Sequence, residues 1–385
     1  MKRKVLFVLY SYNVGGTAVS TRNLVSLLDE SKYEPYIWVL NDKGVLKDLY
    51  KDCNLVKTCF VARALMLTSY KEEKGLRRLG ALLIRFAKNH SGCIKKALCN
   101  HAIRKCIVPN SYDTIIACKE GKETDFVSYI NHPNLVAWVR CDYASTFSKK
   151  QIEQNLGLYR KFKHVVCVSE KTMEGFIGVY PEFANKTICI YNPQNENLLV
   201  QNALIDDYDK RFKTDKTCIV SVGRIHSVKR FSFIPSIASA LVKKGLDFYW
   251  YIIGDGYSQA DLEEIISEIQ KNKMEGKVVL LGAKANAHYY INKADLLVTL
   301  SKSEACPRVV NEAKILHTPV VSTDFPTIYE YIVDHENGLI SPIEKITDAI
   351  YEILTDNELY NKIEKNISAF SFDNTELMQK IYSIL

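Results

Sequence analysis

The chain has 385 residues, more than one hydrophobic core usually serves, so its length predicts two domains. Hydrophobic residues make up 47% and charged residues 25%, a composition that excludes an intrinsically disordered protein. The formal net charge is +7. The eleven cysteines stand singly without C-x-x-C spacing. This pattern is typical of small buried side chains in a reducing cytoplasm, rather than of disulfides or zinc ligands.

The first half of the chain alternates strand-like and helix-like segments. Strands are predicted at 4–10, 34–40, 55–60, 112–118, 135–139, 164–168 and 187–191. Helices are predicted at 18–29, 120–130, 149–159 and 170–180. Continuous Val, Ile and Leu runs indicate strands buried on both faces, as in a parallel sheet. The apolar run to Tyr10 is followed at once by Asn13-Val-Gly-Gly, which favours a first strand over a secretory leader.

Two motifs in this half follow predicted strands. Gly15 and Gly16 precede the first helix, where paired glycines let the backbone approach an anionic ligand; a simple tight turn is the alternative. Arg140 and Asp142 follow the strand that ends in Trp138-Val. Either would meet a sugar or an acceptor hydroxyl at the sheet edge, and the alternative is a surface ion pair.

A basic segment, which begins at Lys71 and ends at Cys106, lies within this half. Its ten basic and two acidic residues give +8, so the rest of the chain sums to −1. A helical wheel places apolar residues on one face and basic residues opposite: Leu76, Leu79, Leu83, Phe86 and Ala87 against Lys74, Arg77, Arg78, Arg85 and Lys88. Two interpretations stay open: a surface helix packed by its leucines, or peripheral attachment to an anionic membrane. No recognition motif accompanies the patch, so nucleic acid is not predicted as a partner.

A second alternating series begins after Asn192-Pro193 and a polar stretch that predicts a linker. Its strands are predicted at 217–222, 248–253, 278–281, 296–300 and 319–322, and its helices at 231–244, 259–271, 287–292, 308–316 and 343–354. Two such series predict an α/β protein with two Rossmann-like, doubly wound domains facing across a cleft. Ligands of such folds bind at the carboxyl ends of the strands.

The stretch that follows the strand at 296–300 is the most informative motif. It reads Ser303-Glu304-Ala-Cys-Pro307-Arg308-Val309-Val-Asn-Glu312, with Pro307 at a predicted helix start. A strand-loop-helix junction directs backbone N–H groups at one point, which suits a phosphate. Carboxylates on both sides of an anion site suggest a ligand with hydroxyl groups beside its phosphates, such as a sugar nucleotide.

A cationic loop follows the first strand of this second series. Gly223 ends the strand, and Arg224 and Lys229 stand five residues apart in the loop. Together they could neutralise a diphosphate leaving group, although both are also common surface residues. The eight histidines show no H-E-x-x-H motif and no Cys/His cluster, so no catalytic metal is predicted.

Taken in order, these motifs resemble glycosyltransferase family 4, whose members are retaining, sugar-nucleotide-dependent enzymes of the GT-B fold. The resemblance is most specific in the second half. It implies that Glu304 contacts the transferred sugar, Glu312 the ribose, and Arg224 and Lys229 the diphosphate. It also implies that backbone N–H groups around Pro307–Val310 and at Gly16 complete the phosphate site, without a metal or an enzyme nucleophile. Arg140 stands where many relatives have a histidine, which puts any histidine-based role in doubt.

The resulting hypothesis assigns residues 1–195 to an acceptor-binding domain and 196–370 to a sugar-nucleotide-binding domain, with a helix in 371–385 packing back on the first. The predicted activity is transfer from a nucleotide sugar, a UDP-sugar rather than a GDP-sugar, to a lipid-linked glycan in surface polysaccharide synthesis such as that of a capsule. The predicted location is the cytoplasm, peripheral at the inner membrane face. Two alternatives stay open: an epimerase or hydrolase of sugar nucleotides, and an inactive homologue that binds a partner.

Overall fold

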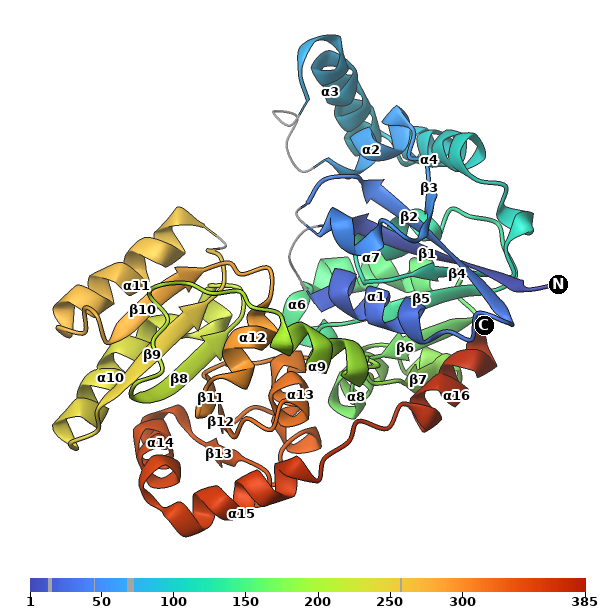
Figure 1. Ribbon diagram of the computed structural model, residues 1–385. Coiled ribbons are helices and arrows are strands. Elements are labelled where there is room, and N and C mark those ends of the chain that lie inside the picture. The colour runs from blue at the N-terminus through green and yellow to red at the C-terminus, as the bar shows by residue number, and fades with distance from the viewer. Residues whose placement is uncertain (13–15, 45, 68–72, 257) are drawn as a thin grey trace. The chain divides into compact units, whose positions relative to one another are not determined.

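The computed structural model describes residues 1–12, 16–44, 46–67, 73–256 and 258–385 (Figure 1). Gly15 and Lys71 lie outside the described residues. The chain divides into two compact units. Unit 1 comprises Met1–Pro193 and Asn374–Leu385, and unit 2 comprises Gln194–Asp373.

Unit 1 is built on a parallel sheet of seven strands in the order β3-β2-β1-β4-β5-β6-β7. The strands are β1 Arg3–Ser11, β2 Tyr33–Asn41, β3 Asn54–Val56, β4 Thr114–Ala117, β5 Leu135–Val139, β6 His164–Cys167 and β7 Thr187–Cys189. Its helices are α1 Gly16–Leu27, α2 Phe60–Met66, α3 Gly75–His90, α4 Gly92–Cys106, α5 Lys122–Val127, α6 Tyr143–Thr146, α7 Lys149–Tyr159, α8 Glu170–Val179 and α16 Thr375–Ile384. This strand order has a switch point between β1 and β4, as in a doubly wound fold.

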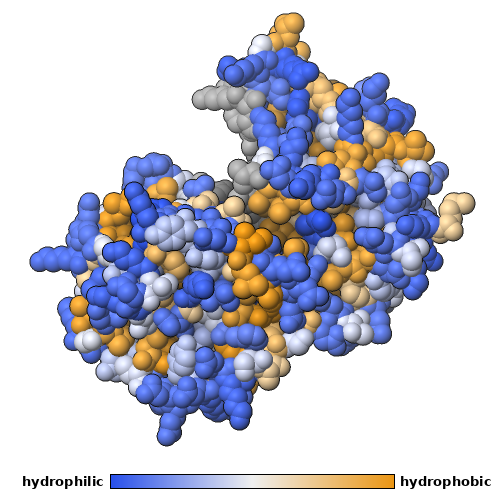
Figure 2. All heavy atoms as spheres, viewed as in Figure 1, coloured by the Kyte–Doolittle hydropathy of each residue, from blue (hydrophilic) through white to orange (hydrophobic). Residues whose placement is uncertain are grey.

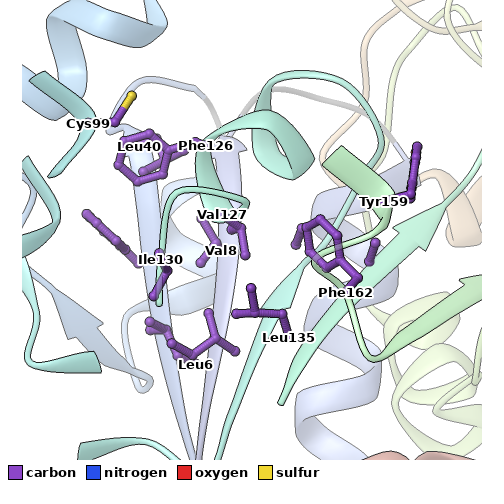
Figure 3. Close-up of a cluster of buried hydrophobic side chains, with 14 of the residues drawn as sticks. Leu6, Val8, Leu40, Cys99, Phe126, Val127, Ile130, Leu135, Tyr159 and Phe162 are labelled. Atoms are coloured by element: carbon purple, nitrogen blue, oxygen red, sulfur yellow. The ribbon is translucent and has the colours of Figure 1, made fainter. Parts of the chain in front are cut away.

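The core of unit 1 follows from its uninterrupted apolar strands. Leu6 and Val8 of β1 are fully buried against side chains from α5, including Phe126 and Val127 (Figure 3). Polar side chains cap the first turns of several helices. Ser148 forms a capping box with Gln151 at the start of α7. Because the strands are parallel, their carboxyl ends and the loops that follow them lie at one edge of the sheet.

The C-terminal helix α16 belongs to unit 1. The rings of Tyr33 and Tyr382 stack with their centroids 5.1 Å apart. The Thr114 hydroxyl donates to the Leu385 carbonyl at 2.6 Å, and the Asn134 amide donates to the Ile384 carbonyl at 3.1 Å. The end of the chain thus accepts hydrogen bonds from Thr114 at the start of β4 and from Asn134 just before β5.

Unit 2 has a parallel sheet of six strands in the order β10-β9-β8-β11-β12-β13. The strands are β8 Thr217–Val222, β9 Phe248–Ile253, β10 Val278–Gly282, β11 Leu296–Thr299, β12 Val320–Thr323 and β13 Leu339–Ser341. Its helices are α9 Glu196–Leu204, α10 Ile234–Lys243, α11 Gln259–Lys271, α12 Ala287–Asn292, α13 Arg308–Ile315, α14 Ile346–Thr355 and α15 Asn357–Ser368. The switch point of this sheet lies between β8 and β11.

Three local predictions are wrong. The polar stretch after Pro193 is not a linker throughout, because Asn195 caps helix α9 there. The strand predicted at 55–60 ends at Val56, since Cys59 already caps α2. Helix α13 begins at Arg308, and Pro307 is its N-cap rather than its first residue.

Of the two interpretations left open for the basic segment, a surface helix packed by its leucines does not hold. Leu76, Leu79, Leu83 and Phe86 on α3 are exposed, so the leucine face does not pack on the domain. Helix α3 instead contacts α2 through Ala81, which is buried against Ala64 and Leu67. Small side chains allow the close approach: a Cβ added at Gly80 would lie 3.3 Å from the Phe60 ring.

Candidate functional site

The candidate site of unit 2 lies at the switch point of its sheet, where the loops after β8 and β11 separate in opposite directions. These two loops carry Lys229 and Glu304. A backbone hydrogen bond joins them, because the Lys302 N–H donates to the Val228 carbonyl at 2.8 Å. Two segments that are more than seventy residues apart in the sequence are therefore held together at the sheet edge.

Lys229 and Glu304 form an ion pair. Lys229 Nζ donates to Glu304 Oε1 at 2.7 Å, and the side chains are 20% and 14% exposed. The Ser301 hydroxyl donates to the same oxygen at 2.6 Å. The Thr327 hydroxyl donates a hydrogen bond to the backbone carbonyl of Glu304, which holds the loop in place. The Glu304 carboxylate is thus oriented by two donors while part of it faces solvent.

Glycines allow the cationic loop to lie close to the neighbouring strand. A Cβ on Gly254 would lie 1.8 Å from the Gly223 carbonyl oxygen, which no side chain could accept. At Gly223 a Cβ would come within 3.3 Å of Lys229 Cε. The bare backbone at 223 therefore leaves the path along which the Lys229 side chain reaches Glu304.

Glu312 lies on helix α13, which follows the loop after β11. Arg308 donates to Glu312 Oε1 at 2.6 Å, and His288 Nε2 lies 3.8 Å from the other carboxylate oxygen. Burial opposes ionisation of this carboxyl, but the charges of Arg308, His288 and Lys229 hold the pKa of Glu312 below its ordinary value. The buried Glu312 is therefore an anion at neutral pH, within the electrostatic reach of Lys229.

The other predicted residues of this half take different positions. Arg224 is exposed on the loop that begins at Gly223. Val309 is buried in the first turn of α13. The Arg308 and Val310 N–H groups donate to the Cys306 and Pro307 carbonyls at 2.9 Å, so both are already used within this turn. The predicted anion site at this helix start therefore has fewer amides to offer than its sequence suggests.

Arg140 follows β5, at the carboxyl edge of the unit 1 sheet. Its Nε donates to the Cys118 carbonyl at 2.7 Å, and one terminal nitrogen donates to Ser20 Oγ at 2.8 Å and Asn192 Oδ1 at 2.5 Å. Its own N–H donates to Glu120 Oε2 at 2.7 Å. Arg140 therefore joins helix α1 to the segments that follow β4 and β7, rather than forming a simple surface ion pair.

Two further features of unit 1 lie at the same sheet edge. Gly16 begins α1, the helix that carries the Ser20 partner of Arg140. Glu123 is buried at the start of α5 and accepts from the Tyr10 N–H at 3.1 Å. Burial raises the pKa of Glu123 to about 7. A carboxyl that titrates near neutral pH therefore lies beside the carboxyl end of β1.

Sequence reasoning missed several members of these clusters. His288 comes from α12, and nothing in its local sequence pointed to Glu312. Ser301 and Thr327 are short hydroxyl residues of a kind that is common in loops. The Arg308–Glu312 pair could have been inferred, because a spacing of four on a helix brings opposite charges together. Among the residues that the structure describes, no group of three or more His, Cys, Asp and Glu is placed to hold a metal ion.

The chemistry of the unit 2 cluster suits a ligand with both charge and hydroxyl groups. Lys229 offers a compact cation and Arg308 a planar one, while Glu304 and Glu312 accept hydrogen bonds. Comparison with known proteins identifies the segment that carries them. Residues 205–370 match the family model "Glycosyl transferases group 1". This group 1 segment includes the loops after β8 and β11 and the helix α13.

Curated relatives of this chain are also named as glycosyltransferases. An uncharacterized glycosyltransferase of Haemophilus influenzae is 26% identical over 204 residues, which cover 52% of each chain. An N-acetylgalactosaminyltransferase of Campylobacter jejuni, named for a diphospho-undecaprenol substrate, is 25% identical over 278 residues, covering 65% of this chain and 73% of its own. For the first three curated relatives that match, the chain spans about half of their length, 40% to 56%.

Solved structures show the fold. Anabaena HepE in complex with UDP and glucose superposes with a TM-score of 0.76 at 18% identity, covering 99% of this chain and 98% of that one. Both sheets have the Rossmann strand order, and the predicted GT-B fold class is confirmed.

Proposed function

We propose that this chain is a retaining glycosyltransferase of family 4 that transfers a sugar from a nucleotide diphosphate to a glycan acceptor. The observation that carries the proposal is the cluster of Lys229, Glu304, Arg308 and Glu312 at the switch point of unit 2. A sheet edge of this kind is where doubly wound folds bind nucleotides. The match of residues 205–370 to the group 1 glycosyl transferases supports the same activity.

Each residue has a role in this proposal. Lys229 and Arg224 balance the charge that develops on the diphosphate when the bond between the sugar C1 and the phosphate oxygen breaks. Glu304 accepts hydrogen bonds from hydroxyls of the transferred sugar, and Glu312 accepts them from the ribose. The acceptor oxygen bonds to C1 on the face that the phosphate leaves. Its proton passes to the departing phosphate, so no covalent enzyme intermediate is required.

The acceptor side is assigned to unit 1, where Arg140 and Gly16 lie at the sheet edge. We propose a lipid-linked glycan acceptor and a role in surface polysaccharide synthesis at the cytoplasmic membrane face. This rests on the names of relatives: the Campylobacter enzyme, the lipopolysaccharide core glycosyltransferase LpsE of Rhizobium meliloti and the amylovoran glycosyltransferase AmsD of Erwinia amylovora. A UDP-sugar is the favoured donor, because HepE and TarM were solved with UDP.

A thermal-shift screen tests the proposal. UDP, GDP, ADP and their sugars are added to the full chain, and the matching base should raise the melting temperature, because a ligand that binds only the folded state stabilises it. Lys229→Met should reduce the shift strongly at the same ligand concentration. The control Lys277→Met removes another lysine of unit 2 that is ion-paired, to Asp247, and should keep the shift.

Product analysis separates the rival activities. Release of nucleoside diphosphate that depends on an added acceptor supports transfer. Turnover without an acceptor would instead indicate the hydrolase or epimerase. A chain that binds none of these nucleotides would overturn the proposal in favour of the inactive, partner-binding homologue.

A further inference from the structure

Helix α3 in unit 1 presents a row of large apolar side chains to solvent. Leu76, Leu79, Leu83 and Phe86 are 88%, 56%, 62% and 63% exposed. Spacings of three and four residues place them on one face of the helix. Exposed hydrophobic residues are common singly, but a continuous row marks an interaction site. Figure 2 shows hydrophobic atoms at the surface over α3, beside hydrophilic ones.

The opposite face of α3 holds the helix on unit 1. Ala81 is buried against α2, and Ile84 packs beside it. Lys88 Nζ donates to the Leu65 carbonyl at 2.5 Å. The helix is thus held on unit 1 by its contacts with α2 and with the Leu65 carbonyl, and its apolar row lies on the outer side. This orientation does not serve the core of unit 1.

The positive charge around the apolar row indicates which kind of partner it binds. Helices α3 and α4 together contain eight Lys and Arg and no Asp or Glu. Arg78 and Arg85 are exposed and seven residues apart, so they lie on the same flank of the apolar row. Lys96, Arg104 and Lys105 are exposed on α4. A second copy of the chain would bring the same positive charge to this surface and would be repelled.

We propose that the outer face of α3 inserts into the surface of an anionic lipid bilayer, with Leu76, Leu79, Leu83 and Phe86 among the acyl chains and the arginines at the headgroups. An apolar row flanked by cations is the pattern of helices that lie in a membrane interface. None of the helices in the described part of the chain is long and apolar enough to cross a membrane. A helix that lies in the interface contacts one leaflet. This proposal deepens the proposed location at the membrane face, but it does not depend on the sugar transfer, because α3 lies outside the group 1 segment.

Vesicle co-sedimentation with the full chain tests the insertion. The probes are vesicles of phosphatidylcholine alone and of phosphatidylcholine with about one-third phosphatidylglycerol, at low salt and at 1 M NaCl. Binding is expected on the anionic vesicles. High salt should weaken it without abolishing it, because screening removes the contribution of the arginines but not that of the buried leucines.

Variants separate the two contributions. Leu79→Gln with Leu83→Gln should lower the partition coefficient at least tenfold at both salt concentrations, because the apolar area is lost. Arg78→Gln with Arg85→Gln should lower it by about 30-fold, and at low salt only. The matched control is Leu204→Gln on α9 of unit 2, which is 76% exposed and should change nothing. Melting temperatures of all variants should stay near that of the wild type, since every changed side chain is exposed.

Tryptophan fluorescence reports insertion directly. The three native tryptophans, Trp38, Trp138 and Trp250, are buried and should not respond to lipid. In Phe86→Trp the added indole should shift its emission to the blue when anionic vesicles are added. The proposal would be overturned if this shift were absent, or if the Leu79→Gln, Leu83→Gln variant bound vesicles as well as the wild type does. It would also be overturned if that variant lost a dimer formed by two copies of the chain but kept its vesicle binding.

Discussion

Lys229 and Glu304 form an ion pair, and replacing one or the other should change the affinity for UDP in opposite directions. Lys229→Met removes a cation from the proposed diphosphate site. A charge-assisted hydrogen bond contributes about 1.5–3 kcal/mol, so the affinity for UDP should fall roughly 10- to 100-fold. Glu304→Gln removes a carboxylate that competes for Lys229 at 2.7 Å and repels the diphosphate. UDP should therefore bind this variant at least as tightly as the wild type, and by the same electrostatics several-fold more tightly.

The effect on folding should be smaller than the effect on binding. Both side chains are mostly buried, but Ser301 continues to donate to Glu304 after Lys229 is replaced. We therefore expect Lys229→Met to cost about 1–2 kcal/mol of unfolding free energy. Lys277→Met removes a more exposed pair and should cost less than about 1 kcal/mol.

Isothermal titration calorimetry with UDP measures the binding terms, and urea denaturation measures the stabilities. The double variant completes a cycle that isolates the coupling of the pair. The reasoning would be refuted if Lys229→Met bound UDP as the wild type does. It would also fail if Glu304→Gln weakened UDP binding as strongly as Lys229→Met.

Two further predictions concern the units separately. Glu123 has a raised pKa of about 7, so the folded state holds its proton more tightly than the unfolded chain does. Its contribution to stability is complete below about pH 4.5 and is lost as the pH rises through about 7, a change on the order of 3 kcal/mol. Glu123→Gln should remove that slope in urea denaturation from pH 5 to 8, and an unchanged slope would contradict the assignment. Gly254→Ala should unfold unit 2 or lower its melting temperature by more than 10 °C, because the new Cβ would collide with the Gly223 carbonyl. The control Gly157→Ala, with no atom within 4 Å of the new Cβ, should melt within a few degrees of the wild type.

Much of the fold could be predicted because its strands are buried on both faces. The apolar runs at 217–222 and 248–253 coincide with β8 and β9. Strand ends then located the candidate residues, since ligands of a doubly wound sheet bind at the carboxyl edge. Lys229 and Glu304 could be placed near one another on this ground before any distance was known.

Tertiary contacts decided what the sequence pattern could not. The amphipathic pattern of α3 separates leucines from arginines, but it does not say which side faces the protein. Gly80 and Ala81 decide this, because only small residues let α3 approach the Phe60 ring. Similarly, the approach of His288 to Glu312 depends on how α12 packs beside α13, which no local spacing encodes. The helix α9 was missed because its polar start resembles a linker.

A crystal structure of the full chain with UDP would test the central claim most directly. The account predicts the diphosphate at the carboxyl ends of β8 and β11, within hydrogen-bond distance of Lys229 Nζ, and the ribose hydroxyls at the Glu312 carboxylate. UDP bound at another edge of the sheet, or with its phosphates away from Lys229, would contradict it.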